Sequence, residues 1–132
     1  MTGDESPPGV PPAPGVPDAA GQVDARVVLV TAPGEDAAER LVAALVAEGV
    51  VACGTIVPGA LSIYRWKGAI EREREALVVF KTTVHGVARL LERVPALHPY
   101  EVPEVLVLPV EAGHGPYLDW LAANVGTSAE GD

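Results

Sequence analysis

The residues of this chain best suited to chemistry lie together at positions 98–104, which read HPYEVPE. They supply an imidazole (His98), a phenol (Tyr100) and two carboxylates (Glu101 and Glu104), all of which can bind a ligand. Proline fixes φ and lacks a backbone donor, so the two prolines end the preceding helix and hold the segment extended. The segment therefore predicts a rigid, shaped surface. The alternative is a helix end and a turn, in which His98 satisfies the last helical carbonyls.

The elements that must position these residues follow from hydrophobic periodicity. Period-two or continuous apolar stretches predict strands over residues 26–31, 50–66, 69–82 and 105–110. Period-3.6 stretches predict two helices between them and a short last helix that Gly115-Pro116 opens. The order β-α-β-β-α-β plus a terminal helix is the ferredoxin-like α+β arrangement. Four antiparallel strands would carry two helices on one face and leave the other face bare.

Local signals predict where these elements begin and end. Asp36 and Glu39 have the spacing of a capping box for the first helix, and Thr83 is a candidate N-cap of the second. Pro58-Gly59 predicts a bulge in the second strand, and Lys67-Gly68 predicts a tight turn between the second and third strands. For the second helix we expect an inward face made of Val87, Leu90, Leu91 and Val94.

The predicted second and third strands are long for so small a domain, because typical strands run about five or six residues. A projecting hairpin beside a bare sheet face is a surface for association. We therefore expect an oligomer from the strand lengths and the layer arrangement alone.

The third strand opens with an alternating charge pattern, ERERE, at 71–75. Because strand side chains alternate, Glu71, Glu73 and Glu75 fall on one face and the two arginines on the other. One interpretation is a cation-attracting row. The interpretation we prefer is a solvated edge whose charges pair across strands or between subunits.

Composition sets the domain boundaries. The chain has 132 residues, and its first 23 hold six of the 13 prolines and four of the 14 glycines, without an aromatic or basic residue. Such a stretch cannot bury enough apolar surface to fold. We predict disordered tails at 1–23 and 126–132 and one folded domain at 24–125. No stretch has the pattern of a signal peptide or of a membrane span, so we expect no membrane association.

Charge and cysteine content restrict the partners and the compartment. The chain has a net charge of −9, but residues 25–125 contain 12 acids and nine bases, a balance of −3. Without a basic patch to neutralise a phosphate backbone, we expect no nucleic-acid binding. A single cysteine, Cys53, leaves no internal disulfide and indicates a cytoplasmic protein.

Enzymatic motifs are missing from the sequence. It has no serine or cysteine nucleophile motif and no zinc-protease motif. The loop after the first strand, residues 31–36, is acidic and has no arginine to hold a phosphate. We therefore expect that this chain is not an enzyme.

Several motifs occur together in a characteristic order: Ala52-Cys53, IVPG at 56–59, SIYRWKG at 62–68, Lys81-Thr82, HPYEVPE at 98–104 and YLDW at 117–120. Over about residues 26–123 this pattern resembles the CutA divalent-cation-tolerance family. The resemblance implies a ferredoxin-like homotrimer, similar in architecture to the PII nitrogen-signalling proteins. It also implies a link to tolerance of copper and other divalent cations, and no organic cofactor.

The resemblance further implies a metal site, because His98 matches a family histidine proposed to bind copper. Where metal-binding members carry a second histidine and a cysteine, this chain has Leu97 and Val30. A cupric site uses several imidazole or carboxylate ligands, so nearby glutamates are candidates to complete the shell. The candidate ligands for Cu²⁺ or another divalent cation are His98, Glu101, Glu104 and Cys53. The alternative for the cysteine is a small buried side chain with an inert thiol.

A second candidate site is built on aromatic residues. Tyr64 and Trp66 share a strand face, and we expect them to line a cleft between protomers together with Lys81, Tyr100 and Glu101. Aromatic walls with one cation suit a small anionic ligand. The alternative is that the aromatic side chains anchor the subunit interface.

Two functions of different class follow from these sites. The first is a trimeric, cytoplasmic metal-tolerance protein that binds divalent cations, copper among them, near His98. The second is a PII-like signalling module that binds a small ligand in the cleft between subunits.

Overall fold

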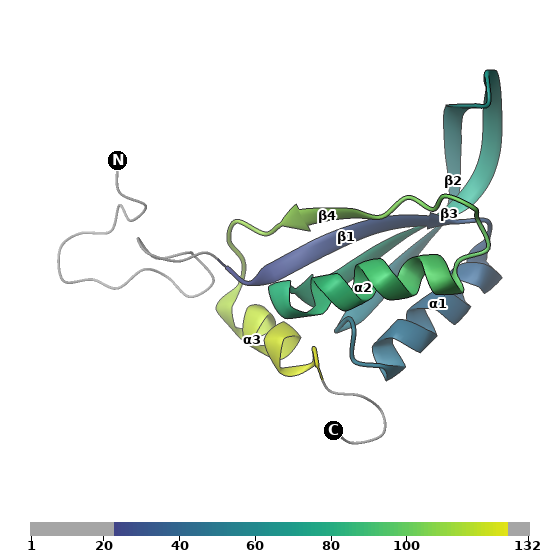
Figure 1. Cartoon of the computed structure of the whole chain (residues 1–132). Coiled ribbons are helices and arrows are strands. Elements are labelled where there is room, and N and C mark those ends of the chain that lie inside the picture. Colours follow the sequence, from purple (N-terminus) through teal and green to yellow (C-terminus); the bar gives the residue numbers. More distant parts are fainter. Residues whose placement is uncertain (1–22, 127–132) are drawn as a thin grey trace, which may run out of the picture.

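The computed structural model describes residues 23–126 of the chain (Figure 1). Its elements are β1 (Ala25–Ala32), α1 (Glu35–Ala47), β2 (Cys53–Trp66), β3 (Ala69–Thr83), α2 (Val84–Leu97), β4 (Leu106–Pro109) and α3 (Gly115–Ala123). The order confirms the ferredoxin-like prediction with its additional C-terminal helix. The proposed tails lie outside the described residues except at their inner ends. There, Val23 packs against a buried cluster and the Gly126 N–H donates to the Gly49 carbonyl across 2.7 Å.

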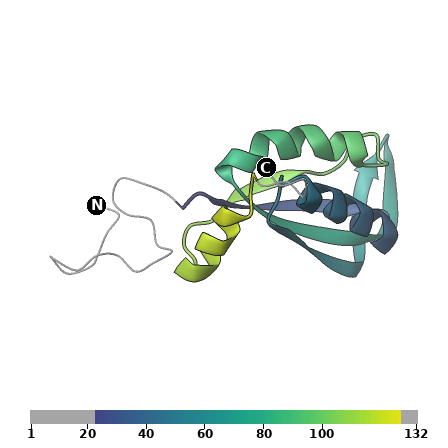
Figure 2. The same cartoon turned by 90° about the horizontal axis from the view of Figure 1, so that it is seen from below.

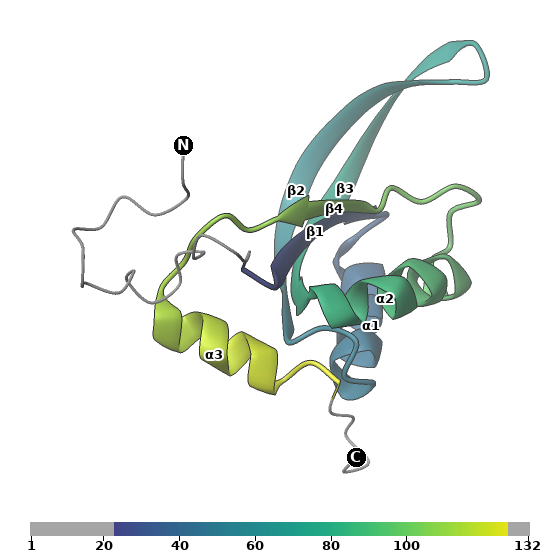
Figure 3. The same ribbon diagram turned by 60° about the vertical axis from the view of Figure 1, so that its left-hand side comes forward.

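The four strands form one antiparallel sheet in the order β2-β3-β1-β4. Helices α1 and α2 lie on one side of it, as Figures 2 and 3 show. Alternate residues of β1 and β3 point into the core beneath these helices, where Val28, Val30, Val78 and Phe80 are fully buried. Val30 is therefore a core residue. It occupies the position at which the resemblance implies a cysteine in metal-binding members of the family.

The opposite face of the sheet carries apolar side chains that stay exposed in the single chain. Leu106 and Leu108 of β4 are 54% and 44% exposed, and Val57 of β2 is 44% exposed. Helix α3 covers only one end of the sheet, where Leu121 packs against Ala25 and Ala52. None of the described helices combines the length and the apolar content needed to cross a membrane.

The β2–β3 hairpin extends well beyond the rest of the sheet (Figures 1 and 3). Only residues 76–83 of β3 pair with β1, so residues 69–75 pair with β2 alone. Lys67 and Gly68 close the hairpin with φ values of 50° and 84°, the two positive values that a type I′ turn requires. The β2–β3 register shifts between Val57 and Ala60, which confirms the predicted bulge at residues 58–59.

Of three helix predictions, one is confirmed, one is wrong and one is right in part. Thr83 caps α2, since its hydroxyl oxygen accepts a hydrogen bond from the His85 N–H. The capping box predicted for α1 was wrong: the cap is Gly34 and makes no side-chain hydrogen bond, because the helix already includes Asp36 in its first turn. The inward face of α2 is also displaced. Leu91 is 46% exposed, and the buried residues of the helix are Gly86, Leu90 and Val94.

Candidate functional site

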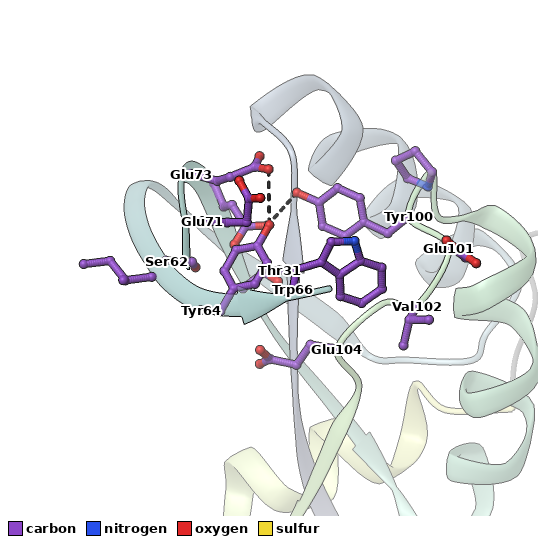
Figure 4. Close-up of a pocket in the computed structure, with 13 residues that line it drawn as sticks. Thr31, Ser62, Tyr64, Trp66, Glu71, Glu73, Tyr100, Glu101, Val102 and Glu104 are labelled. Carbon is purple, nitrogen blue, oxygen red and sulfur yellow. Dashed lines mark hydrogen bonds between the residues drawn. The ribbon is translucent and has the colours of Figure 1, made fainter. Parts of the chain in front are cut away.

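A pocket of about 760 Å³ lies between the projecting hairpin and the loop that follows α2 (Figure 4). Residues 62–75 of β2 and β3 form one wall, and residues 99–104 form the other. Its aromatic lining consists of Tyr64, Trp66 and Tyr100. The neutral lining consists of Thr31, Ser62, Ile63, Pro99 and Val102.

The pocket is acidic. Five glutamates line it: Glu71, Glu73, Glu75, Glu101 and Glu104. No lysine, arginine or histidine stands among the lining residues in the described part of the chain. The local potential therefore attracts positive charge and repels anions.

The deepest glutamate of the pocket is held by a tyrosine. Glu75 is only 6% exposed, and its Oε2 accepts a hydrogen bond of 2.6 Å from the Tyr100 hydroxyl. Burial and this carboxylate together raise the pKa of Tyr100 far above its usual range, because both favour the neutral phenol. The interaction joins the loop after α2 to the base of the hairpin.

A second tyrosine–glutamate pair lies further out along the hairpin. The Tyr64 hydroxyl donates to Glu73 Oε1 across 3.2 Å, and Figure 4 shows both tyrosine hydroxyls directed toward the acidic row. Partial removal from water is the larger cause that raises the pKa of Tyr64, and the hydrogen bond to the Glu73 carboxylate is the second. The alternation that was predicted to place Glu71, Glu73 and Glu75 together is confirmed. The solvated-edge interpretation was wrong for Glu75, because Tyr100 covers it from a distant part of the sequence.

His98 lies beside the pocket but not in its lining, and it is 8% exposed. Its Nδ1 accepts a hydrogen bond of 3.0 Å from the Tyr100 N–H, and its Nε2 lies 2.7 Å from the Thr31 carbonyl. A carbonyl can only accept, so Nε2 carries the proton. Both ring nitrogens are thus used within the chain, and the imidazole can bind a metal only if one of these hydrogen bonds breaks. The alternative interpretation was that His98 satisfies the last carbonyls of the helix. This holds only for the backbone, where the His98 N–H donates to the Val94 carbonyl.

Two predicted site residues lie elsewhere on the sheet. Lys81 pairs in register with Cys53 and Val27, whereas Thr31, which lines the pocket, pairs with Leu77. Four strand residues correspond to roughly 13 Å, so the ammonium and thiol lie at the opposite end of β3 from the pocket. Within one protomer Lys81 therefore does not join the aromatic residues, and its ammonium instead donates to Thr55 Oγ1 across 2.8 Å.

Cys53 is also separated from the other candidate metal ligands. Its thiol is half-buried and lies 3.8 Å from the Tyr117 hydroxyl, close to α3. The interpretation of Cys53 as a buried side chain therefore does not hold for the single chain. Within residues 23–126, no group of three or more histidine, cysteine, aspartate or glutamate side chains is close enough to hold one metal ion.

The structure thus brings together Tyr64, Trp66, Tyr100, Glu101 and Glu104 from the predicted sites. Sequence reasoning did not find Thr31 and Ser62, which have no chemical signature of their own. The glutamates of β3 did have a signal, the period-two acidic row, but the row alone did not reveal that a loop 25 residues later closes over it.

Comparisons with known proteins agree with this architecture. Residues 26–124 match the family model described as CutA1 divalent ion tolerance protein. The divalent-cation tolerance protein CutA of Thermus thermophilus is 51% identical over 100 residues, which cover 76% of this chain and 97% of the relative. The protein of the same name from Citrobacter koseri is 48% identical over 102 residues, covering 77% and 89%.

A solved structure leads to the same assignment. CutA1 from Oryza sativa superimposes with a TM-score of 0.77 at 39% identity, covering 81% of this chain and 98% of that one. Because the family model spans most of the chain and the relatives align over nearly their whole lengths, this chain belongs to the CutA1 divalent ion tolerance family.

Proposed function

We propose that this chain is a divalent-cation tolerance protein that binds the cation in the acidic pocket beside His98. The observation that carries the proposal is the pocket's charge: five glutamates and no cationic residue line it within the described chain. Relatives named for divalent-cation tolerance support the same class of ligand.

The donors we propose are carboxylate oxygens, with Glu101 and Glu104, which follow His98 in the same loop, as the metal ligands. Both glutamates are exposed in the loop after α2 and line the pocket. Because the His98 ring is occupied on both sides, we assign it the role of holding this loop against β1. Among divalent ions, Cu²⁺ binds most tightly to a given set of nitrogen and oxygen donors, so copper is the proposed cation.

The protein acts, in this proposal, as a cytoplasmic homotrimer with no catalytic step. The exposed apolar side chains of Val57, Leu106 and Leu108 on the uncovered sheet face support self-association. Since one protomer has no cluster of three ligands in its described part, water or a neighbouring protomer must complete the metal's coordination. Light scattering at micromolar concentration tests the oligomer, and a monomer would refute it.

The experiment is a calorimetric titration of tag-free protein with Cu²⁺ and Zn²⁺. A Glu101→Gln/Glu104→Gln variant should bind Cu²⁺ at least about tenfold more weakly, because each lost carboxylate removes a charged donor. The control is Glu111→Gln, an exposed glutamate after β4 that does not line the pocket. Equal copper affinity in the double variant and the control would overturn the proposed site.

A second candidate function is a PII-like module that binds a small organic ligand. The observation in its favour is the pocket's size, about 760 Å³, which falls in the range of small-molecule sites and far exceeds the space one ion occupies. Three aromatic side chains in the lining support the same interpretation.

A further inference from the structure

The buried carboxylate of Glu75 has no positive partner in the described part of the chain. The ion pairs found there join Glu48 to Arg89 and Arg93, on helices α1 and α2. Glu75 is only 6% exposed, and Tyr100 donates to its Oε2. Among the described residues no fully buried side-chain oxygen lacks a hydrogen-bond partner, so Oε1, which has none within the chain, opens to the pocket that Glu75 lines. A carboxylate largely removed from water and without a counter-charge favours a positive group in the pocket.

The carboxylates of the pocket are spread along a line rather than gathered around one point. Glu71, Glu73 and Glu75 are alternate residues of β3, so neighbouring members lie roughly 6.5 Å apart along the strand. This spacing agrees with the finding that no three described acidic, cysteine or histidine side chains converge on one metal ion. A single ion cannot contact all three carboxylates of a row with this spacing, whereas a chain of spaced positive charges can contact each of them.

The aromatic residues of the pocket supply apolar surface between these negative charges. Tyr64 stands beside the row, directly across the hairpin from Glu71, and Tyr100 covers Glu75. The face of Trp66 already accepts an ammonium within this chain, since Lys67 Nζ lies 5.6 Å from the ring centroid. Aromatic faces stabilise ammonium groups and pack against methylene segments.

We propose that the pocket binds a linear organic polycation, with ammonium groups on Glu71, Glu73 and Glu75 and methylene segments against the aromatic rings. A four-carbon spacer between amines has about the spacing of alternate strand residues, which makes polyamines the matching chemical class. The inference rests on the second candidate function above and names its ligand. It replaces the small anion expected for the aromatic cleft, because the only cation assigned to that cleft, Lys81, lies elsewhere.

The test is calorimetric titration of the full chain with spermidine. The wild type should bind it, and Glu71→Gln/Glu73→Gln should weaken binding at least about tenfold, because two charged contacts are lost. Both glutamates lie in the part of β3 that pairs only with β2, so the variant leaves the buried Glu75 and the core unchanged. Glu111→Gln is the matched control and should bind like the wild type. Trp66→Leu should weaken binding about threefold or more.

Other outcomes would overturn the proposal. It fails if the wild type does not bind spermidine, or if the glutamate double variant and Glu111→Gln bind it equally. It also fails if spermidine binds only after the oligomer is diluted into monomers, because a second copy of the chain would then occupy the pocket.

Titrating the same proteins with Cu²⁺ separates the two functions. Copper binding without spermidine binding would overturn the polycation proposal and leave the metal function standing. Spermidine binding without copper binding would support the polycation and overturn the metal site.

Discussion

The Tyr100 hydroxyl donates a 2.6 Å hydrogen bond to the buried Glu75 carboxylate, and these two residues are 25 positions apart in the sequence. The bond connects three features: the loop after α2, the base of the hairpin and the deepest point of the acidic pocket. His98 supports the same loop from behind, since its Nδ1 accepts from the Tyr100 N–H and its ring packs 4.7 Å from the Tyr100 ring.

Removing the Tyr100 hydroxyl should destabilise the fold. In Tyr100→Phe the buried Glu75 loses its donor, and an unsatisfied buried polar group costs about 1–3 kcal/mol. Urea denaturation measures the loss. The control is Tyr117→Phe, because the Tyr117 hydroxyl has only a 3.8 Å contact with the Cys53 sulfur. Equal losses of unfolding free energy in the two variants would show that the hydrogen bond to Glu75 stabilises the fold no more than the Tyr117 contact does.

The ionisation of Tyr100 should make this contribution depend on alkaline pH. The pKa of Tyr100 is raised in the folded state, so its stabilising effect is complete below the unfolded pKa of about 10 and is lost as the pH rises beyond it. We expect the stability difference between wild type and Tyr100→Phe to be constant near neutrality and to narrow above roughly pH 10. The pKa values of Tyr64 and Tyr117 are raised as well, so phenolate absorbance should show one late-titrating tyrosine fewer in the variant than in the wild type; identical titration curves would contradict this.

His98 should be neutral with its proton on Nε2. This tautomer follows from its two partners, the Tyr100 N–H at Nδ1 and the Thr31 carbonyl at Nε2. Nitrogen chemical shifts of the imidazole, measured by NMR near neutral pH, identify the protonated nitrogen. Addition of Zn²⁺ should leave these shifts unchanged if the metal binds carboxylates only. A metal-dependent shift of either ring nitrogen would make His98 a ligand and not a positioning residue.

Gly86 should tolerate no side chain. A Cβ at this position of α2 would lie 2.6 Å from the Val50 carbonyl and would also overlap the Thr82 hydroxyl. Gly86→Ala should therefore destabilise the protein by about 1–3 kcal/mol, although alanine favours helix more than glycine does. Gly34→Ala is the control, because a Cβ there meets nothing within 4 Å. A melting temperature raised by Gly86→Ala would contradict the close approach.

The fold could be predicted from the sequence where local chemistry decides it. The Thr83 cap, the Lys67-Gly68 turn and the break at residues 58–59 each depend on neighbouring residues only, and all three occur as expected. Leu91 was misplaced because the predicted inward face contained large apolar residues only, whereas the buried face of α2 includes Gly86. Gly86 is buried since it lets α2 approach the chain at Val50, a contact that the period-3.6 pattern of large apolar residues does not register.

The candidate site could be predicted only in its parts. The aromatic pair of β2 and the glutamates of residues 98–104 do line one pocket. The burial of Glu75 could not be foreseen, because Tyr100 reaches it through tertiary structure. The positions of Lys81 and Cys53 depend on strand register, which places both at the far end of the sheet from His98.

The register shift at residues 58–59 determines the parity of the outer hairpin. Val57 faces the same side as Leu77, and by strict alternation residues 61, 63 and 65 would follow it. The extra residue reverses this order, so that Tyr64 lies opposite Glu71 while Ile63 lies opposite Arg72. If the same sequence paired without the bulge, Ile63 would lie opposite Glu71, and the tyrosine and tryptophan would lie on the arginine side of the hairpin. The bulge that accommodates one extra residue thus decides whether the aromatic side chains and the carboxylates can act on the same molecule.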